Sequence, residues 1–595
     1  STFLDHCRRL FNVTNLCTIT PVHSCEHEEH PLVKPISSSE VDEALCHKKS
    51  RASSVSGYSP IDLKSVRTSL SCPLSKLFTY FLKSSTFFLD WLQSSVFFIY
   101  KGKGCRSDPG NYRSICVQNP FAKIYSSILT KRLSSFAESQ DLLPIFQFGF
   151  RSNRSTTAAA ALLHEIAHTR LINGKRTYVA YIDFTKAFDR VSRPLLFHKL
   201  QLLGIPPQFC QSLNFIFHST KYFIKSGEFF THPYTSNVGV PQGDPISPIL
   251  FNLFIHDLPS SLTHSGVDFH GINITYIQYA DDLCVIGESP EDLQKGLNDL
   301  QAYCDANLID INVSKTKAQV FHRGRLPECS FSLHGREIEI VNNFVYLGFD
   351  FSTQLSFSQH ARTLTSKARS KCGLLFSRLQ ILDLPLQIVL DLYSAFILPI
   401  FTYGLPLWLS NCCASTLQMV DSTFTKFLKR YFMVPPHFNN ATIHFLSSTI
   451  PLSNHLKIIA PNVMGALSFP TILHGIQLSF TPDSSHETAG EALETLKKIP
   501  STFWLSRILP SSMPSNRTSR KRLMREILDS DHFRICQTST FHPYPLPSCI
   551  CPTNTPDNAS FIEKEWKSRG QNLLAAKLGK SHFNPLSIGV SIDLP

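Results

Sequence analysis

Two adjacent carboxylates, Asp281 and Asp282, are the residues best placed for chemistry in this sequence. They follow Tyr279-Ala280 and lie between two apolar runs, residues 272–277 and 283–286, so the segment predicts a strand, a two-residue turn and a second strand with both carboxylates at the tip. Acidic side chains held side by side could bind a divalent cation. Aspartate is also a favoured turn residue, so a solvated acidic loop is the alternative for this pair taken alone.

A third carboxylate, Asp183, follows the β-rich run 178–182, and the C-terminal end of a strand is where α/β chemistry tends to be placed. Three aspartates suit nucleotidyl transfer, in which two Mg²⁺ ions about 3.5–4 Å apart activate a 3′-hydroxyl and neutralise the departing pyrophosphate. Magnesium keeps water and takes few carboxylates, so aspartates are expected rather than His or Cys. Basic groups must balance the triphosphate, and Lys101, Arg113 and Lys315 are the candidates.

Composition places these residues in a folded, basic, multidomain protein. The chain has 595 residues, and single cores stop growing at roughly 250–300 residues. A surplus of 57 Lys+Arg over 45 Asp+Glu gives a net charge of +12, which suits a polyanionic partner but also describes many proteins that never touch nucleic acid. The 17 scattered cysteines indicate a reducing compartment and mostly free thiols. Residues 77–100 are too polar to cross a bilayer, so no membrane partner is expected.

Several constrained loops and helices must position the candidate residues. Residues 101–104 interleave two lysines with two glycines after a predicted strand, and form either a phosphate-binding loop or a solvated turn. Residues 147–156 form a second basic loop, whose Ser155 or Thr156 would cap the alanine-rich helix 157–171. Residues 239–248 hold three prolines and two glycines, which fix an unusual backbone path. Residues 311–321 predict a strand.

Seven short motifs along the chain contain or accompany these candidate residues. They are Asn111-Tyr112-Arg113, Gln147-Phe148-Gly149-Phe150-Arg151, Tyr181-Ile182-Asp183-Phe184-Thr185-Lys186-Ala187-Phe188-Asp189, Pro241-Gln242-Gly243-Asp244, Tyr279-Ala280-Asp281-Asp282, Asn312 with Lys315-Thr316, and Tyr346-Leu347-Gly348. The series resembles the motif set of reverse transcriptases, and more narrowly that of non-LTR (LINE-type) retrotransposons. The resemblance covers roughly residues 40–430 and is specific, because seven motifs keep the family's order.

The resemblance implies an α+β right-hand polymerase, with fingers, a palm built on an antiparallel sheet, a helical thumb and a mostly helical C-terminal region. The implied boundaries are a loosely ordered lead-in at 1–45, fingers at 46–175, a palm at 176–355 with a fingers insertion at about 191–236, a thumb at 356–440 and a C-terminal region of unknown role at 441–595.

The resemblance also implies roles for individual residues. Asp183, Asp281 and Asp282 would be the catalytic, metal-binding aspartates, and Lys315 would protonate pyrophosphate, with a plain surface lysine as the alternative. The residues implied to bind the nucleotide are Phe184, Phe188, Gln242, Gly243, Lys101 and Arg113. Among these, Phe188 would screen out a 2′-hydroxyl, and Lys103 is a rival for Lys101. Asp189 is expected to be a structural helix cap.

The implied activity is RNA-directed DNA synthesis for retrotransposition: deoxynucleoside triphosphates are added to a primer 3′-hydroxyl, with Mg²⁺, or Mn²⁺ instead, as cofactor. The implied partners are an RNA template and a DNA primer or nicked target DNA, in a nuclear or cytoplasmic ribonucleoprotein. Three departures bear on this, and the first is that the family's Asn-Tyr-Arg-Pro becomes Asn111-Tyr112-Arg113-Ser114. Residues 57–60 keep only part of the family's fingers turn, and no endonuclease is recognisable, so a nuclease would be missing by truncation or supplied in trans; the start at Ser1 fits an incomplete product. The alternatives are an inactive relic that binds RNA, and an intron-type maturase.

Overall fold

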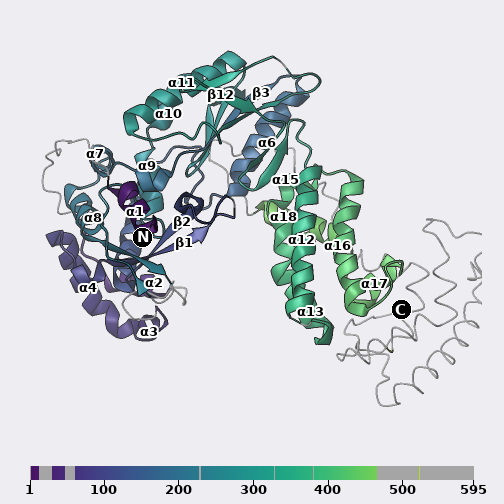
Figure 1. The fold of residues 1–595 in the computed structure, drawn as a ribbon, viewed down its shortest axis with the longest axis horizontal. Helices are drawn as coiled ribbons and strands as arrows, with labels where there is room; N and C mark the ends of the chain where they lie inside the picture. The colour runs from purple at the N-terminus through teal and green to yellow at the C-terminus, as the bar shows by residue number, and fades with distance from the viewer. Residues whose placement is uncertain are drawn as a thin grey trace, which may run out of the picture. The chain divides into compact units, whose positions relative to one another are not determined.

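The computed structural model describes residues 2–12, 30–46, 60–102, 104–226, 229–326, 328–379, 381–465 and Arg522 (Figure 1). The chain divides into two compact units. Of the described residues, the first unit contains 2–348 and 352–354, and the second contains 349–351 and those from 355 onward. No described helix is both long enough and apolar enough to span a bilayer.

A six-stranded sheet forms the centre of the first unit, in the order β11-β12-β10-β3-β9-β8. The strands are β3 (Thr177–Ile182), β8 (Tyr276–Tyr279), β9 (Asp282–Gly287), β10 (Lys317–Phe321), β11 (Phe331–Leu333) and β12 (Arg336–Ile340). Neighbouring strands are antiparallel, except that β10 and β12 run parallel. Every residue of β3 is buried, as its continuous apolar sequence predicts for a central strand. The predicted α+β architecture with a largely antiparallel sheet is confirmed.

Two helices pack against this sheet, α6 (Thr156–Ile172) and α11 (Pro290–Asn307) (Figure 1). Helix α6 is buried around most of its circumference, because its small alanine side chains allow close packing on several sides. The side chain of Ser155 accepts a hydrogen bond from the Ala158 N–H at 3.0 Å, which confirms Ser155 as the predicted N-cap.

A second sheet has the order β2-β1-β4-β5, built from β1 (Gln93–Tyr100), β2 (Tyr112–Gln118), β4 (Lys221–Ser226) and β5 (Phe229–Phe230). Strands β1 and β2 are antiparallel, whereas β4 joins β1 in parallel. Its core includes Leu4 and Cys7 from helix α1 (Thr2–Phe11), together with Val96, Cys116 and Tyr222 from the strands.

The predicted loosely ordered lead-in is therefore wrong for the residues described there. Residues 2–11 form α1, because its apolar side chains find a sheet distant in sequence to pack on. Residues 30–46 are held by Arg132 of helix α5 (Pro120–Ser139), which pairs with Glu40 of helix α2 (Ser38–Cys46) at 2.7 Å and donates hydrogen bonds to three backbone carbonyls nearby.

The remaining elements of the first unit complete its helical layers and short hairpins. They are α3 (Pro60–Ser65), α4 (Arg67–Ser84), α7 (Arg193–Leu202), α8 (Pro207–Ser219), α9 (Ser247–Phe254), α10 (Leu258–Ser261), the 3₁₀ turns η1 (Leu89–Trp91), η2 (Pro109–Asn111) and η3 (Ala187–Arg190), and strands β6 (Val267–Phe269), β7 (Ile272–Ile274) and β13 (Asn343–Tyr346).

The described part of the second unit is mostly helical, as the resemblance implies for a thumb. Its elements are α12 (Ser358–Arg378), η4 (Ile381–Asp383), α13 (Leu386–Phe396), α14 (Leu398–Thr402), α15 (Leu405–Leu409), α16 (Ala414–Phe432), α17 (Asn440–Leu446) and α18 (Leu452–Gly465), joined by most of β14 (Phe349–Ser352). Helix α16 packs against α12, α17 and α18. Most of the predicted C-terminal region, from residue 466 onward, lies outside the described residues apart from Arg522.

Candidate active site

The strand register of the six-stranded sheet brings the three predicted aspartates together. Strands β3 and β9 are antiparallel, and Ile182 pairs with Leu283. The next residue outward on each strand is therefore Asp183 on one side and Asp282 on the other. Asp281 precedes Asp282 in the turn that joins β8 to β9, so all three carboxylates lie at one edge of the sheet.

The hairpin tip differs by one residue from the prediction. Tyr279 pairs with Asp282, so the two turn residues are Ala280 and Asp281, and Asp282 begins β9. Ala280 adopts a left-handed backbone with φ 56°, which is uncommon for a residue with a side chain. The surrounding contacts must therefore stabilise this turn.

Burial raises the pKa of all three carboxyls, and neighbouring carboxylates raise the pKa of Asp281 and Asp282 further. Desolvation and the neighbouring charges of Asp281 and Asp183 raise the pKa of Asp282 to about 6. Desolvation and the charge of Asp183 also raise the pKa of Asp281. Neither Asp281 nor Asp282 forms an ion pair with any described residue. This edge of the sheet thus concentrates negative charge.

Lys315 and the turn around it lie against Asp183. The Lys315 Nζ is 3.8 Å from an Asp183 carboxylate oxygen. Desolvation raises the pKa of Asp183, while Lys315 and Lys101 act in the opposite direction. The Asn312 N–H donates to the Asp183 carbonyl at 2.8 Å, and the Asp183 N–H donates to the Thr316 hydroxyl at 3.3 Å. The predicted strand 311–321 is consequently wrong in its first half: these bonds draw residues 312–316 into a turn, and β10 begins at Lys317.

Two further cations reach this space from the second sheet of the same unit. Lys101 follows β1, and Arg113 lies on β2 opposite Ile99. The Lys101 Nζ donates to the Gly110 carbonyl at 3.1 Å. Partial burial, followed by the charges of Lys315 and Arg113, lowers the pKa of Lys101. The predicted cations therefore share one electrostatic environment with the aspartates, whereas the rival Lys103 lies outside the described residues.

Phe188 and Phe184 take different positions after β3. The Phe188 ring stacks on Phe251 of α9, with centroids 4.6 Å apart, and its edge meets Phe150 at 6.4 Å. Phe184 is buried and forms an isolated bridge with Ile311, so its side chain belongs to the core. We therefore expect any nucleotide contact of Phe184 to involve its backbone.

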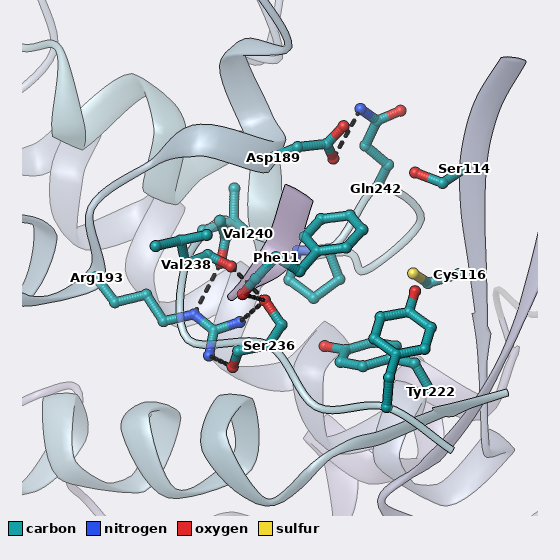
Figure 2. A pocket seen from close by; sticks show the side chains of 13 residues that line it. Phe11, Ser114, Cys116, Asp189, Arg193, Tyr222, Ser236, Val238, Val240 and Gln242 are labelled. Carbon is teal, nitrogen blue, oxygen red and sulfur yellow. Dashed lines mark hydrogen bonds between the residues drawn. The ribbon is translucent and has the colours of Figure 1, made fainter. Parts of the chain in front are cut away.

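Gln242 lies at a pocket formed by α1, β2, η3 and the loop 236–242 (Figure 2). Its side-chain amide donates to a carboxylate oxygen of buried Asp189 at 3.2 Å. Burial raises the pKa of Asp189 to about 6, against the influence of Lys186 and this hydrogen bond. Asp189 caps no helix; it lies within η3, whose N-cap is Lys186. The helix-cap prediction for Asp189 is therefore wrong, because the carboxylate turns inward to Gln242.

Backbone contacts with β2 fix the loop that carries Gln242. The Cys116 N–H donates to the Gln242 carbonyl at 2.7 Å. Gly243 has φ 110°, and a Cβ there would lie 2.5 Å from the Cys116 carbonyl oxygen. Position 243 therefore requires glycine, because strand β2 approaches it too closely for a side chain. Figure 2 shows Arg193 below the same loop, where it donates to the Gly239 and Ser236 carbonyls at 2.9 and 2.6 Å.

The sequence does not predict which residues hydrogen-bond the hairpin that carries Asp281 and Asp282. The sequence predicts Gln147 only as part of a basic loop, yet its side-chain oxygen accepts the Ala280 N–H at 2.9 Å. Arg151 of that loop is held by Glu138 at 2.7 Å. The available signal was a glutamine, Gln278, in the middle of an otherwise apolar strand, because a buried polar side chain must find a partner.

The donor set suits a hard divalent cation. Within the described ranges, no three His, Cys, Asp or Glu side chains are arranged as a complete metal site. Asp183 and Asp282 nevertheless lie next to paired positions of β3 and β9, with Asp281 next to Asp282, and the three side chains offer only oxygen ligands. Magnesium prefers such ligands and completes its coordination with water and substrate phosphates. The chemistry of the three carboxylates therefore fits this ion.

Comparison with known proteins shows that the chain is similar to RNA-directed DNA polymerases of mobile elements. Residues 99–351 match the family model described as reverse transcriptase (RNA-dependent DNA polymerase). The RNA-directed DNA polymerase from mobile element jockey of Drosophila melanogaster is 26% identical over 66% of this chain and 43% of its own length. The probable RNA-directed DNA polymerase from transposon BS of the same species is 24% identical over 63% of this chain and 42% of its own length. The Pol polyprotein from type-1 retrotransposable element R2 of Popillia japonica is 29% identical over 33% of this chain. The chain spans less than half the length of the first two relatives.

Proposed function

We propose that this chain, in which residues 99–351 are a reverse transcriptase domain, copies RNA into DNA for a non-LTR retrotransposon. The reaction is the addition of deoxynucleotides to a primer 3′-hydroxyl. One observation carries the proposal: the register of β3 and β9 places Asp183 beside Asp281-Asp282, and Lys315 faces Asp183 at 3.8 Å. Phosphoryl transfer relies on metal ions held by carboxylates and on cations that neutralise the phosphate charge.

Asp183, Asp281 and Asp282 would hold Mg²⁺, which supplies Lewis-acid activation of the 3′-hydroxyl and neutralises charge on the leaving pyrophosphate. Lys101 and Arg113 bind the triphosphate electrostatically, since both cations share the environment of the aspartates. Lys315 gives a proton to the departing pyrophosphate. A donor aimed at developing charge contributes more where bound substrate excludes water than it does in bulk water.

Phe188 and Gln242 select and place the sugar. Phe188 is braced by Phe251 at 4.6 Å, so the ring cannot easily give way to a 2′-hydroxyl. Gln242 is held by Asp189 at 3.2 Å, which limits the positions that its side chain can take. A fixed side chain discriminates better than a mobile one, because a substrate that does not fit cannot be accommodated by rearrangement.

The proposed partners are an RNA template and a DNA primer, with an endonuclease supplied elsewhere in the same protein or in trans. Residues 46–175 would act as fingers, 176–355 as palm and 356–440 as thumb. Helix α12 of the second unit carries five exposed cations, Arg362, Lys367, Arg369, Lys371 and Arg378. Cations on one helix suit the phosphate backbone of a template–primer duplex, and such binding weakens steeply as salt rises.

Primer extension on an RNA template tests the proposal. Wild-type chain is expected to add deoxynucleotides in Mg²⁺ or Mn²⁺, Asp282→Asn to lose this activity, and Asp305→Asn, at an exposed position on α11, to keep it. If the wild-type chain incorporates no more than Asp282→Asn, the polymerase function is refuted, and RNA binding alone becomes the function that the chain can support.

A further inference from the structure

A buried network of hydrogen bonds connects the residues 146–149 to the catalytic hairpin. The Gln147 side-chain oxygen accepts two backbone N–H groups, from Gly149 at 2.8 Å and from Ala280 at 2.9 Å. Gln147 is 1% exposed, so water does not replace these bonds. Ala280 directly precedes Asp281, and the network therefore ends one residue from the proposed metal ligands.

The backbones of the two segments also pair directly. The Gln278 N–H donates to the Phe146 carbonyl at 3.0 Å, and the Phe148 N–H donates to the Gln278 carbonyl at 2.7 Å. Gly149 approaches so closely that a Cβ there would lie 2.2 Å from the Ala280 nitrogen. The sequence Gln-Phe-Gly thus matches the shape of the turn as well as its hydrogen-bonding groups.

Two fully buried side chains, Gln278 and Asn252, form further hydrogen bonds to Ala280 and Gly149. Gln278 donates its amide to the Ala280 carbonyl at 2.9 Å, so both backbone groups of Ala280 are bonded by glutamines. Asn252 of α9 donates to the Gly149 carbonyl at 2.7 Å. Both Gln278 and Asn252 are 0% exposed. The left-handed φ of 56° at Ala280 is maintained by these bonds, because the turn would otherwise relax toward a less strained backbone.

We infer that Gln147 is a positioning residue for DNA synthesis: by accepting the Ala280 N–H, it fixes the turn that aims Asp281 and Asp282 at the reacting groups. This inference rests on the proposed function. Gln147 touches neither substrate nor metal, and acts through the backbone of Ala280. Its side-chain nitrogen has no hydrogen-bond partner among the described residues, so the oxygen is the atom that its role requires.

The test compares two substitutions at Gln147 with a matched control. Gln147→Met keeps the length of the side chain but cannot accept the two N–H groups, and Gln147→Glu keeps an acceptor oxygen. Gln319→Met is the control, because Gln319 is also fully buried in the first unit and its side-chain oxygen accepts a hydrogen bond from the Tyr181 hydroxyl at 2.8 Å. Gly149→Ala displaces Ala280 sterically and serves as a second variant if Gln147→Met does not fold.

Single-nucleotide incorporation should show a selective loss of kcat. A catalytic group moved by about 1 Å can cost roughly 10²-fold, so Gln147→Met and Gly149→Ala are expected to lower kcat by about 10- to 100-fold, with KM for the deoxynucleotide near the wild-type value. Gln147→Glu should retain most of the activity, and Gln319→Met should match the wild type once both are folded. Amide hydrogen exchange in residues 276–284 should accelerate in Gln147→Met and not in Gln319→Met.

The outcomes separate this inference from the proposed function. An active wild type with kcat unchanged in folded Gln147→Met would overturn the positioning role while leaving the polymerase function intact. Equal loss in Gln147→Glu and Gln147→Met would overturn the role of the acceptor oxygen. An inactive wild type would refute the polymerase function, and hydrogen exchange of the Ala280 segment would still decide whether Gln147 fixes the turn.

Discussion

Lys315 holds its ammonium nitrogen 3.8 Å from a carboxylate oxygen of Asp183, so the proposed acid and one proposed metal ligand are partners in the free protein. Both side chains remain well exposed, at 66% and 44%. An exposed pair of this kind contributes little to stability and can separate when substrate enters. Lys315 is therefore free to move from Asp183 to a phosphate group.

Substitution of Lys315 should lower the rate of nucleotide addition without unfolding the chain. Lys315→Gln removes charge and proton, and a general acid contributes typically 10²–10⁴-fold, so kcat should fall by about that factor. Lys315→Arg keeps the charge but holds its proton, and should be nearly as slow. Lys175→Gln is the control, since Lys175 is exposed in the loop between α6 and β3. The rate of nucleotide incorporation under pre-steady-state conditions provides the measurement. If both Lys315 variants incorporate nucleotides at the wild-type rate, Lys315 is a plain surface lysine.

Phe188 and Phe251 together should determine the choice of sugar. The two rings stack at 4.6 Å, so removing the supporting ring should loosen the selecting one. Phe188→Ala is expected to reduce the preference for deoxynucleotides over ribonucleotides by roughly 10- to 200-fold, and Phe251→Leu by a smaller factor. Competing incorporation of labelled dNTP and rNTP provides the measurement. A Phe188→Ala variant that still rejects ribonucleotides as wild type does would exclude Phe188 from this selection.

Asp189 should make folding stability depend on pH in a defined direction. Its pKa is about 6 in the folded chain against a reference of 3.8, because the carboxyl is buried. Between these pH values the folded state binds more protons than the unfolded state. The stability that the protonated Asp189 contributes is therefore fully present below about pH 4 and is lost as pH rises through about 6. The shift corresponds to about 3 kcal/mol at most.

Asp189→Asn removes this titration and should therefore gain stability relative to wild type when the pH is raised from 4.5 to 7. Urea unfolding midpoints of the two chains at both pH values test the expectation. The difference between wild type and variant is the quantity of interest, since Asp282 titrates in the same range and contributes equally to both. A difference that does not change with pH would show that Asp189 does not titrate as its burial requires.

The local parts of the site could be predicted from the sequence, because their patterns span few residues. The β-rich run before Asp183 and the apolar runs around Asp281-Asp282 each identify a strand end, and the order of the motifs links them. The contact between Gln147 and Ala280 spans 133 positions, and no local pattern encodes such a pair. Helix α1 was missed for the same reason: its apolar side chains acquire a partner only when β1, β2 and β4 assemble.

Arg193 offers the sharpest test of how the Gln242 loop is held. Its guanidinium is 1% exposed and donates to the carbonyls of Gly239, Ser236 and Phe217 at 2.9, 2.6 and 3.1 Å. A planar group with several fixed donors can satisfy these carbonyls at once, whereas a lysine ammonium cannot match the same directions. Arg193→Lys should therefore destabilise the chain nearly as much as Arg193→Met, by about 2–4 kcal/mol, since buried carbonyls are left unbonded in both.

Arg176→Lys, at an exposed position in the same unit, is the control. Chemical unfolding measures stability, and KM for the deoxynucleotide should rise in any Arg193 variant that folds, because Pro241 and Gln242 follow the loop directly. If Arg193→Lys unfolds at the wild-type midpoint, charge rather than the fork of hydrogen bonds holds this loop.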